Sequence, residues 1–483
     1  MYMSLPQKRI LFLLLALLMA ACFGCAGGKE TAPVQTAEPI LIATSAPEEE
    51  SVPTPIPAPQ LKYIFLFIGD GMGYHQVQTT SEALAASGQK PLSFLAFPVQ
   101  GSVKTNNVEG KVTDSAAAAT AISTGQKTSN SFLGLDSDKN RLETIAETLR
   151  NLGRKIGILT TVSLDHATPA GFYAHVDSRR SYATIADDLF ASGFDYFAGG
   201  GFHNTPDSAE LAVENGYTLI HSFEEAPVST EGRLILSSSL LFGDYGVLPA
   251  IDAGERTNWL KKATELAITR LTVPEGFFMM VEGGRIDYFC HYNDAGSFVA
   301  ELLDMDKAIQ SALAFYAEHP QETLILVTAD HETGDVTLGD GDRAALLRQA
   351  ISSDTCENTL VADCLAAKTQ FEKALPLFAS AFGLADLRAD ETALLKEAYA
   401  KTLANSARGN TSNEESGVYD PITTACINLV AARAGVHFGS GGHTPQDVPL
   451  YAIGIGSEFF AGNFENTNIH DAIQKAVAAY PIS

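Results

Sequence analysis

The segment Tyr63–Gly73 reads YIFLFIGDGMG and decides the fold class. An unbroken apolar run, rich in aromatic and β-branched residues, stops at a glycine and an aspartate. Such a run is typical of a strand that is buried on both faces of a sheet. The three glycines allow close approach of the backbone or a positive φ. The segment therefore predicts a central strand that ends in a turn carrying the carboxylate of Asp70.

Further short apolar runs alternate with helix-like stretches. The runs are Ile156–Val162, Phe277–Val281, Leu324–Val327 and Leu450–Ile455. The helix-like stretches are Leu142–Leu152, Tyr182–Ala191 and Phe298–His319. This alternation predicts an α/β fold with a large, mostly parallel, buried sheet. Active sites of such sheets lie outside the carboxyl ends of the strands, where this chain places several acidic and histidine residues.

Composition limits the kind of protein. The chain has 483 residues, 46% of them hydrophobic, and a formal net charge of −25. It can bury a sizeable core, which excludes global disorder. Nucleic-acid binding needs clustered Lys and Arg, whereas acidic residues outnumber basic ones here by 57 to 32. We therefore predict no nucleic-acid partner.

The N-terminus resembles an export signal. Lys8 and Arg9 precede the apolar run Ile10–Ala21, which is too short to favour a membrane-spanning helix. Two alanines then precede Cys22, as in a bacterial lipobox, and Cys25 is a weaker candidate. We therefore predict that residues 1–21 are a lipoprotein-type signal peptide and that lipidated Cys22 anchors the protein at the outer face of the cell membrane. Ordinary secretion, or release into the periplasm, is the alternative.

The rest of the chain divides in two. Residues 22–60 contain seven prolines and the run Glu48–Glu50, which predicts a disordered, partly extended tether. A leader with no spacing role would have the same composition. Residues 61–483 are expected to form the folded domain. Within it, helical patterns around Arg343–Ile351, Cys364–Phe382 and Glu391–Leu403, followed by the polar segment Asn405–Tyr419, predict a mainly helical insertion at about 340–440.

Four cysteines follow the tether: Cys290, Cys356, Cys364 and Cys426. An exported protein can form disulfides, and Cys356 and Cys364 are close enough in sequence to pair. None of these four cysteines is spaced C-x-x-C with another, which disfavours a zinc site made of their thiolates.

The segment Thr113–Ala121 reads TDSAAAATA. Alanine is the best helix former, so a helix should begin here with Ser115 in its first turn. Free backbone N–H groups and the positive helix end would then surround the hydroxyl, which suits an anion site and a nucleophile. The alternative is that these residues only cap a buried helix.

Acidic and histidine residues recur in three other segments. Val281–His291 reads VEGGRIDYFCH, Thr328–Gly334 reads TADHETG, and Gly441–Thr444 reads GGHT. A helix beginning near Asp287 would put Asp287 and His291 on one face, able to share a cation. Histidine with carboxylate suits catalytic zinc, and a hydroxyl with carboxylates suits magnesium.

Together these segments resemble the alkaline phosphatase family. The matching stretches, in the family's order, are Phe67–Gly73, Val112–Ala117, His166–Ala170, Val281–Asp287, Thr328–Gly334 and Gly442–Thr444. The resemblance implies a three-layer α/β/α sandwich with a helical insertion. It also implies metal-dependent hydrolysis of phosphate monoesters, which releases inorganic phosphate, and it favours a homodimer.

The resemblance also implies roles for individual residues. Ser115 would be the nucleophile that becomes phosphoserine, and Arg179 would grip the phosphate. Two Zn²⁺ and one Mg²⁺ would be bound. The implied ligands are Asp287, His291 and His443 for the first zinc, Asp70, Asp330 and His331 for the second, and Asp70, Thr168 and Glu282 for magnesium. His166 is expected behind the ligands, and Tyr288 either reaches the substrate or packs.

Two alternatives stay within the metallohydrolases. A sulfatase would need a Pro and an Arg shortly after the reactive residue, but three alanines follow Ser115. A phosphodiesterase typically lacks the ligands of a third metal, whereas Thr168 and Glu282 are present. A solute-binding lipoprotein is a further alternative, although it would not need a nucleophile among metal ligands.

Overall fold

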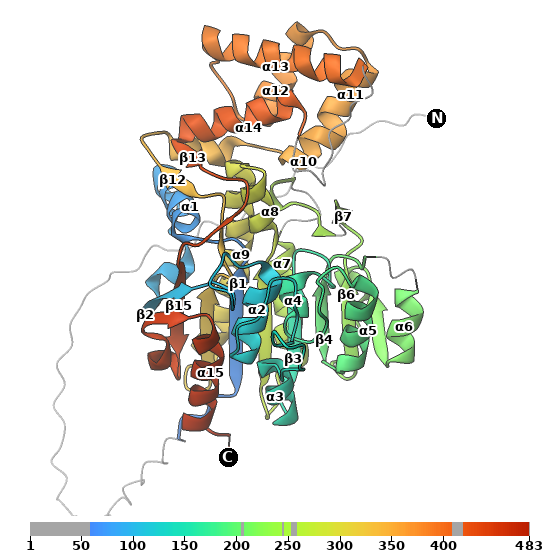
Figure 1. Cartoon of the computed structure of the whole chain (residues 1–483), viewed down its shortest axis with the longest axis vertical. Helices are drawn as coiled ribbons and strands as arrows, with labels where there is room; N and C mark the ends of the chain where they lie inside the picture. The colour runs from blue at the N-terminus through green and yellow to red at the C-terminus, as the bar shows by residue number, and fades with distance from the viewer. Residues whose placement is uncertain (1–57, 204–206, 244–245, 253–257, 408–418, 483) are drawn as a thin grey trace, which may run out of the picture. The chain divides into compact units, whose positions relative to one another are not determined.

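The computed structural model describes residues 58–203, 207–243, 246–252, 258–407 and 419–482. The predicted signal peptide, Cys22 and Cys25 lie outside these residues, as do nearly all of the tether and most of Asn405–Tyr419. Residues from Ala58 onward form one unit (Figure 1). No helix in the described ranges combines the length and apolar character needed to cross a membrane.

A ten-stranded sheet forms the centre of this unit. Its strand order is β16-β2-β15-β10-β1-β9-β3-β4-β6-β5. The strands are β1 (Tyr63–Gly69), β2 (Val99–Lys104), β3 (Lys155–Thr160), β4 (Tyr196–Gly199), β5 (Tyr217–Ile220), β6 (Arg233–Ser237), β9 (Phe277–Gly283), β10 (Thr323–Thr328), β15 (Val448–Gly454) and β16 (Gly462–Glu465). Only β15 runs antiparallel to its neighbours, β10 and β2. The predicted mostly parallel sheet is therefore confirmed.

All five apolar runs in the sequence are strands of this sheet. The shorter strands β4, β5 and β6, the edge strand β16 and its neighbour β2 were not predicted. β2 has only two apolar side chains, Val99 and Val103, and of its residues only Val103 is buried, because a strand near the sheet edge needs less apolar surface. Three small two-stranded sheets lie apart from the main one. They pair β7 (Leu241–Phe242) with β8 (Gly246–Val247), β11 (Glu332–Thr333) with β14 (His443–Thr444), and β12 (Val336–Leu338) with β13 (Val436–Phe438).

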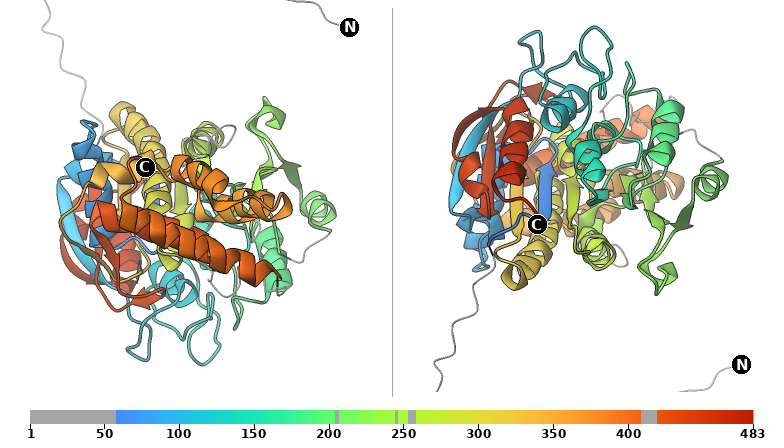
Figure 2. Two further views of the ribbon diagram at one scale, coloured as in Figure 1. Left: turned by 90° about the horizontal axis from the view of Figure 1, so that it is seen from above. Right: turned by 90° about the horizontal axis from the view of Figure 1, so that it is seen from below.

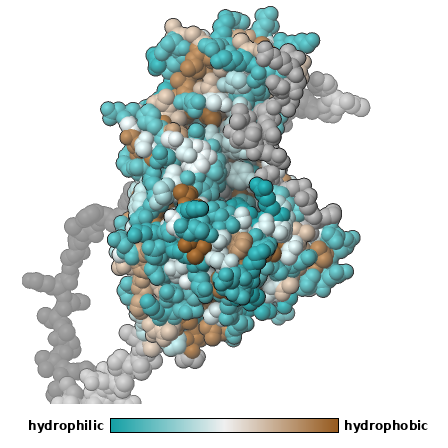
Figure 3. All heavy atoms as spheres, in the orientation of Figure 1, coloured by the Kyte–Doolittle hydropathy of each residue, from teal (hydrophilic) through white to brown (hydrophobic). Residues whose placement is uncertain are grey.

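Helices cover both faces of the sheet, which gives the expected three layers (Figure 2). On one face α7 packs against α9, and on the other α2 packs against α3, α4 and α15. The helices of the sheet region are α1 (Tyr74–Ala86), α2 (Ser115–Thr124), α3 (Ile145–Asn151), α4 (Ala167–Ala170), α5 (Tyr182–Ser192), α6 (Ser208–Glu214), α7 (Trp259–Leu271), α8 (Arg285–His291), α9 (Ala295–Glu318) and α15 (Thr467–Ala479). The predicted helix beginning at Ser115 is confirmed as α2. On the face seen in Figure 3, hydrophilic side chains cover most of the surface, in keeping with the acidic composition.

The chain between β12 and β13 is helical, as its sequence pattern predicts. Its helices are the 3-10 helix η5 (Arg343–Arg348), α10 (Ser353–Thr355), the π-helix η6 (Cys356–Val361), α11 (Ala362–Ala366), α12 (Phe371–Ala381), α13 (Ala389–Ala407) and α14 (Pro421–Ala434). In Figure 1 α10 to α14 lie together beyond the end of the sheet where α8 is found.

The suggested disulfide between Cys356 and Cys364 is wrong. Both residues are buried free thiols, as are Cys290 and Cys426. The two lie on one uninterrupted helical stretch from α10 to α11. Eight residues of helix separate Cα atoms by roughly 12 Å. A disulfide needs less than about 7 Å.

The register of the central strands aligns their carboxyl ends. Ile68 of β1 lies opposite Glu282 of β9 on one side and Thr328 of β10 on the other. Glu282 in turn lies opposite Thr160 of β3. Side chains that follow these strands are therefore collected at one edge of the sheet.

Candidate active site

Three carboxylates from adjacent strands meet at this edge. Asp70 directly follows β1, Glu282 lies near the end of β9, and Asp330 follows β10. All three are fully buried. Gly71 has a φ of 70°, and a Cβ there would lie 2.8 Å from Oδ1 of Asp287. Only glycine therefore lets the turn after β1 pass close to that carboxylate.

Ser115 is the first residue of α2 and is 2% exposed. Asp114 caps the helix, and its Oδ1 accepts a hydrogen bond of 3.0 Å from the backbone N–H of Ala117. The Oγ of Ser115 lies 3.3 Å from Nε2 of His331. A hydroxyl at the positive end of a buried helix, next to an imidazole, is well placed to act on an anion.

Asp287, His291 and His443 form a first group of metal-binding side chains. Their ligand atoms lie within 4.8 Å of one another. Asp287 and His291 share one face of α8, as predicted, with Oδ2 and Nε2 3.1 Å apart. The Nε2 atoms of the two histidines are 3.2 Å apart. Each Nδ1 is held by a carbonyl: Gly441 lies 2.7 Å from that of His291, and Thr113 lies 2.9 Å from that of His443. Both rings thus turn Nε2 toward the carboxylate.

A second group surrounds His331. Its Nε2 lies 3.5 Å from Oδ1 of Asp70 and 3.3 Å from Oδ2 of Asp330. Asp287 also reaches this group, so it stands between the first group and the second. Thr333 donates a hydrogen bond of 2.5 Å to Oδ1 of Asp287 and orients it.

Asp70, His166 and Glu282 form a third group, again with ligand atoms within 4.8 Å. The hydroxyl of Thr168 donates to Oδ2 of Asp70 over 3.3 Å. The hydroxyl of Thr160 donates to Oε2 of Glu282. The structure therefore puts a ring nitrogen of His166 within 4.8 Å of these carboxylate oxygens, whereas the sequence suggested a place for it behind the ligands.

The electrostatics of the three groups suit cations. Burial, and then the charge of neighbouring carboxylates, raises the pKa of Asp70 well above its usual range and that of Asp330 to about 8. Burial also raises the pKa of Glu282 to about 7. Burial by itself would raise the pKa of Asp287. Nearby histidines, of which His291 has the largest effect, instead hold this pKa well below its usual range. Oδ1 of Asp70, Oε1 of Glu282 and Oδ2 of Asp330 accept no hydrogen bond in the described part of the chain. Buried oxygens of this kind fit a metal ion, which would offset their mutual repulsion.

Arg179 lies beside Ser115 through its contact with Asp114. One terminal nitrogen lies 3.3 Å from Oδ2 of Asp114, and the other lies 3.2 Å from Nε2 of His166. Burial, and then the charge of Arg179, lowers the pKa of His166 to about 3, so the imidazole is neutral. Arg179 and Tyr288 line one cavity of about 600 Å³. Tyr288 therefore faces the same space as the arginine.

Sequence reasoning missed several residues that support the site. Asp114 was considered only as a cap, yet it also binds Arg179. Thr160 and Thr333 orient carboxylates from a distance in sequence. Glu332 is 1% exposed and accepts a hydrogen bond from Thr444, so it joins β11 to β14. His331 directly precedes β11, and His443 is the first residue of β14. Glu332 lies within the segment TADHETG, which was the only available signal.

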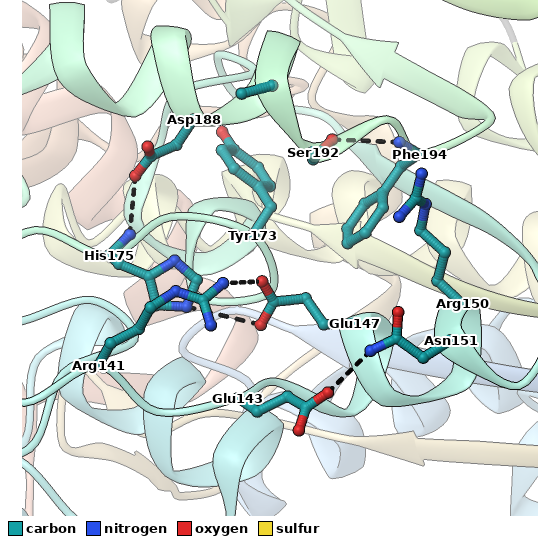
Figure 4. Close-up of a pocket in the computed structure, with 11 residues that line it drawn as sticks. Arg141, Glu143, Glu147, Arg150, Asn151, Tyr173, His175, Asp188, Ser192 and Phe194 are labelled. Carbon is teal, nitrogen blue, oxygen red and sulfur yellow. Dashed lines mark hydrogen bonds and ion pairs between the residues drawn. The ribbon is translucent and has the colours of Figure 1, made fainter.

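A separate pocket of about 390 Å³ lies between α3 and α5 (Figure 4). Its charged side chains already have partners within the protein. Arg141 forms an ion pair with Glu147, and Asn151 donates to Glu143 over 3.0 Å. None of the candidate site residues lines this pocket. It is therefore distinct from the site at the sheet edge.

The chain matches known proteins along most of its length. The family model described as alkaline phosphatase matches residues 61–196 and 232–479. Alkaline phosphatase 3 of Bacillus subtilis (strain 168) is 31% identical over 436 residues, which cover 86% of this chain and 89% of that protein. Alkaline phosphatase of Escherichia coli (strain K12) is 30% identical over 352 residues, which cover 60% and 74%.

Solved structures agree with the sequence comparisons. The cold-active alkaline phosphatase of a psychrophilic Shewanella sp. matches with a TM-score of 0.74 and 26% identity, covering 87% of this chain and all of that one. A variant of TAB5 alkaline phosphatase, with Mg bound in its M3 site, matches with a TM-score of 0.62 and 27% identity, covering 87% and 99%. The family model spans well over half of the chain and the fold agrees, so the chain belongs to the alkaline phosphatase family.

Proposed function

We propose that this protein is a metal-dependent phosphatase that hydrolyses phosphate monoesters through a phosphoserine at Ser115. The observation that carries the proposal is the position of this serine. Its hydroxyl lies at the start of a buried helix, 3.3 Å from His331, among three groups of metal-binding side chains. Family membership supports the same activity.

We propose two Zn²⁺ and one Mg²⁺ as cofactors. The donor types support this assignment: the first two groups offer imidazole and carboxylate, and the third offers two carboxylates and the hydroxyl of Thr168 beside the imidazole of His166. The proposed ligands are Asp287, His291 and His443 for one zinc, Asp70, Asp330 and His331 for the other, and Asp70, Thr168 and Glu282 for magnesium. When bound, these ions would supply the positive field that stabilises a phosphate dianion and the serine alkoxide in an acidic protein.

The chain's own groups account for the remaining chemistry. The hydroxyl of Ser115 loses its proton and its oxygen attacks phosphorus, so that a new P–O bond forms while the ester bond to the leaving group breaks. The leaving oxygen takes up a proton. Water then attacks phosphorus while the bond to Ser115 breaks; the serine oxygen takes up a proton that the water gives up, and inorganic phosphate is released. Arg179 presents a planar, always charged guanidinium that can bind two phosphate oxygens in both steps.

His331 suits a place beside the nucleophile. Burial lowers its pKa well below the usual range, so its imidazole is neutral at physiological pH. A neutral imidazole is the form that binds a metal. Its Nε2 faces both Ser115 and the carboxylate of Asp70.

We also propose the layout and location that the N-terminus suggests. Residues 1–21 would be removed as a signal peptide, lipidated Cys22 would anchor the protein to the membrane, and residues 22–60 would tether the domain at 61–483. The helical segment at about 340–440 would be an insertion into that domain. A homodimer is proposed from the family resemblance.

The activity test uses a chromogenic phosphate monoester, a diester and a sulfate ester. The purified protein should turn over the monoester best, lose this activity after chelation, and regain it when Zn²⁺ and Mg²⁺ are added together. Full activity in metal-free protein would contradict the proposal. A preference for the diester or the sulfate would point instead to another metallohydrolase.

A further inference from the structure

The cavity of about 600 Å³ beside Arg179 has the position of a leaving-group site. It is lined by Asp114, Ser131, His166, Ser178, Arg179, Arg180, Tyr182, His203 and Tyr288. If Ser115 and Arg179 hold the phosphate, as the proposed function requires, the alcohol part of the substrate has to lie next to them. The described lining contains no aliphatic side chain, so the cavity offers little to an apolar leaving group.

Positive charge predominates in this cavity. Its lining carries two arginines and one carboxylate, that of Asp114. That carboxylate already accepts hydrogen bonds of 3.0 Å from the backbone of Ala117 and of Ser131, besides its contact with Arg179. In a chain of net charge −25, a local excess of arginine is a specific feature that attracts anions.

Arg180 is the charge that the catalytic proposal does not use. Its side chain is exposed, and its guanidinium forms no ion pair or hydrogen bond with any of the residues described. Only its backbone N–H is engaged, with Oγ of Ser178 at 3.3 Å. By contrast, Arg348 and Arg388, which are also exposed, pair with acidic side chains. Arg180 is therefore free to bind a ligand.

Two other residues that line the cavity, His203 and Tyr182, are held by several contacts. Asp165, fully buried, accepts from the backbone N–H of His203 at 2.7 Å and lies 3.0 Å from its Nδ1. The imidazole of His203 stacks on the ring of Tyr182, with ring centres 4.1 Å apart. A pre-organised lining that also carries a charged side chain can select a leaving group by its charge as well as by its size.

We propose that this protein favours phosphate monoesters whose leaving group carries a second anion, a carboxylate or another phosphate, and that Arg180 binds this second anion. Arg179 and Arg180 then bind the two ends of one doubly anionic substrate. This inference rests on the proposed function and names the substrate class of the same site.

The test is a series of similar substrates that differ in charge. The specificity constants, kcat/KM, of the full-length metal-loaded enzyme are measured for 3-phosphoglycerate, with an anionic leaving group, for glycerol 3-phosphate, with a neutral one, and for phosphoethanolamine, with a cationic one. The measurement is repeated for Arg180→Ala, Arg180→Lys and Arg180→Glu. Arg388→Ala, which removes an exposed arginine from the helical segment, is the matched control.

We expect the wild type to rank the three substrates in that order. Arg180→Ala should lower the ratio of kcat/KM for 3-phosphoglycerate to that for glycerol 3-phosphate by roughly three- to tenfold, the range between an exposed ion pair and a charged hydrogen bond. Arg180→Lys should keep most of the ratio, and Arg180→Glu should shift the preference toward phosphoethanolamine. High salt should reduce these differences.

An unchanged ratio in Arg180→Ala, or an equal change in Arg388→Ala, would overturn the inference. The failure of the proposed function would look different, because the wild type would then hydrolyse none of the three substrates. In that case, calorimetry on Ser115→Ala still decides the inference. Binding of 3-phosphoglycerate no tighter than that of glycerol 3-phosphate would refute it.

Discussion

Arg179→Ala should weaken phosphate binding without changing the metal content. A guanidinium has five N–H donors, and in this structure Asp114 and His166 engage its two terminal nitrogens from one side. Each terminal nitrogen carries a second N–H and Arg179 lines the cavity, so donors remain for phosphate. Charge-assisted hydrogen bonds contribute about 1.5–3 kcal/mol, so the loss in affinity should be roughly 10- to 150-fold. Arg179→Lys should recover only part of it, because ammonium cannot bind two oxygens in one plane.

Asp287→Ala is the contrasting variant. Asp287 lies between the first and second metal-binding groups, so its loss should lower the zinc content, and excess zinc should partly restore activity. The assay has three readouts for each variant. These are the competitive inhibition constant of inorganic phosphate, the metal content by mass spectrometry, and the thermal unfolding midpoint, which controls for misfolding.

The reasoning about the site is refuted if the two variants exchange their effects. Arg179→Ala that loses zinc, or Asp287→Ala that keeps it, would mean that the arginine supports a metal and the aspartate does not. An unchanged inhibition constant in Arg179→Ala would show that the phosphate lies elsewhere.

Three other substitutions probe the mechanism and the fold. Ser115→Ala should prevent trapping of a phosphorylated serine and reduce activity by several powers of ten; a phosphorylated residue found elsewhere in the wild type would contradict the assignment. Glu332→Ala leaves the buried hydroxyl of Thr444 and two backbone N–H groups without their acceptor, at a cost of about 1–3 kcal/mol for each donor. Urea unfolding should therefore show a clear loss of stability. An unchanged midpoint would show that this carboxylate is dispensable. Burial, and then Glu357, raises the pKa of Asp420 to about 7. A folded-state pKa above the unfolded value adds stability below about pH 4, and this stability is lost as pH rises through 7. Asp420→Asn should therefore unfold at a higher temperature than the wild type at pH 8 but not at pH 4, and parallel pH profiles would refute this.

Local patterns were enough to predict the central part of the fold. The apolar runs of β1, β9 and β10 are buried along their whole length, so hydrophobicity alone marks them as central strands. Strand β2, which lies next to the edge strand β16, has no such pattern, because solvent replaces part of the apolar surface it would otherwise need. The disulfide suggestion failed for a similar reason, since closeness in sequence said nothing about the helix that separates Cys356 from Cys364.

By itself, the sequence determined the elements that carry the chemistry. The alanines after Ser115 start a helix, the i,i+4 spacing puts Asp287 and His291 on one helix face, and acidic residues follow buried strands. Each of these three features depends only on residues a few positions away in the chain. The tertiary structure alone decided which of these groups share space. It placed Asp287 in two metal-binding groups, brought His166 to Arg179, and left Arg180 facing the cavity. These contacts join residues from separate strands and loops, and only strand register and packing of the whole sheet set the distances between them.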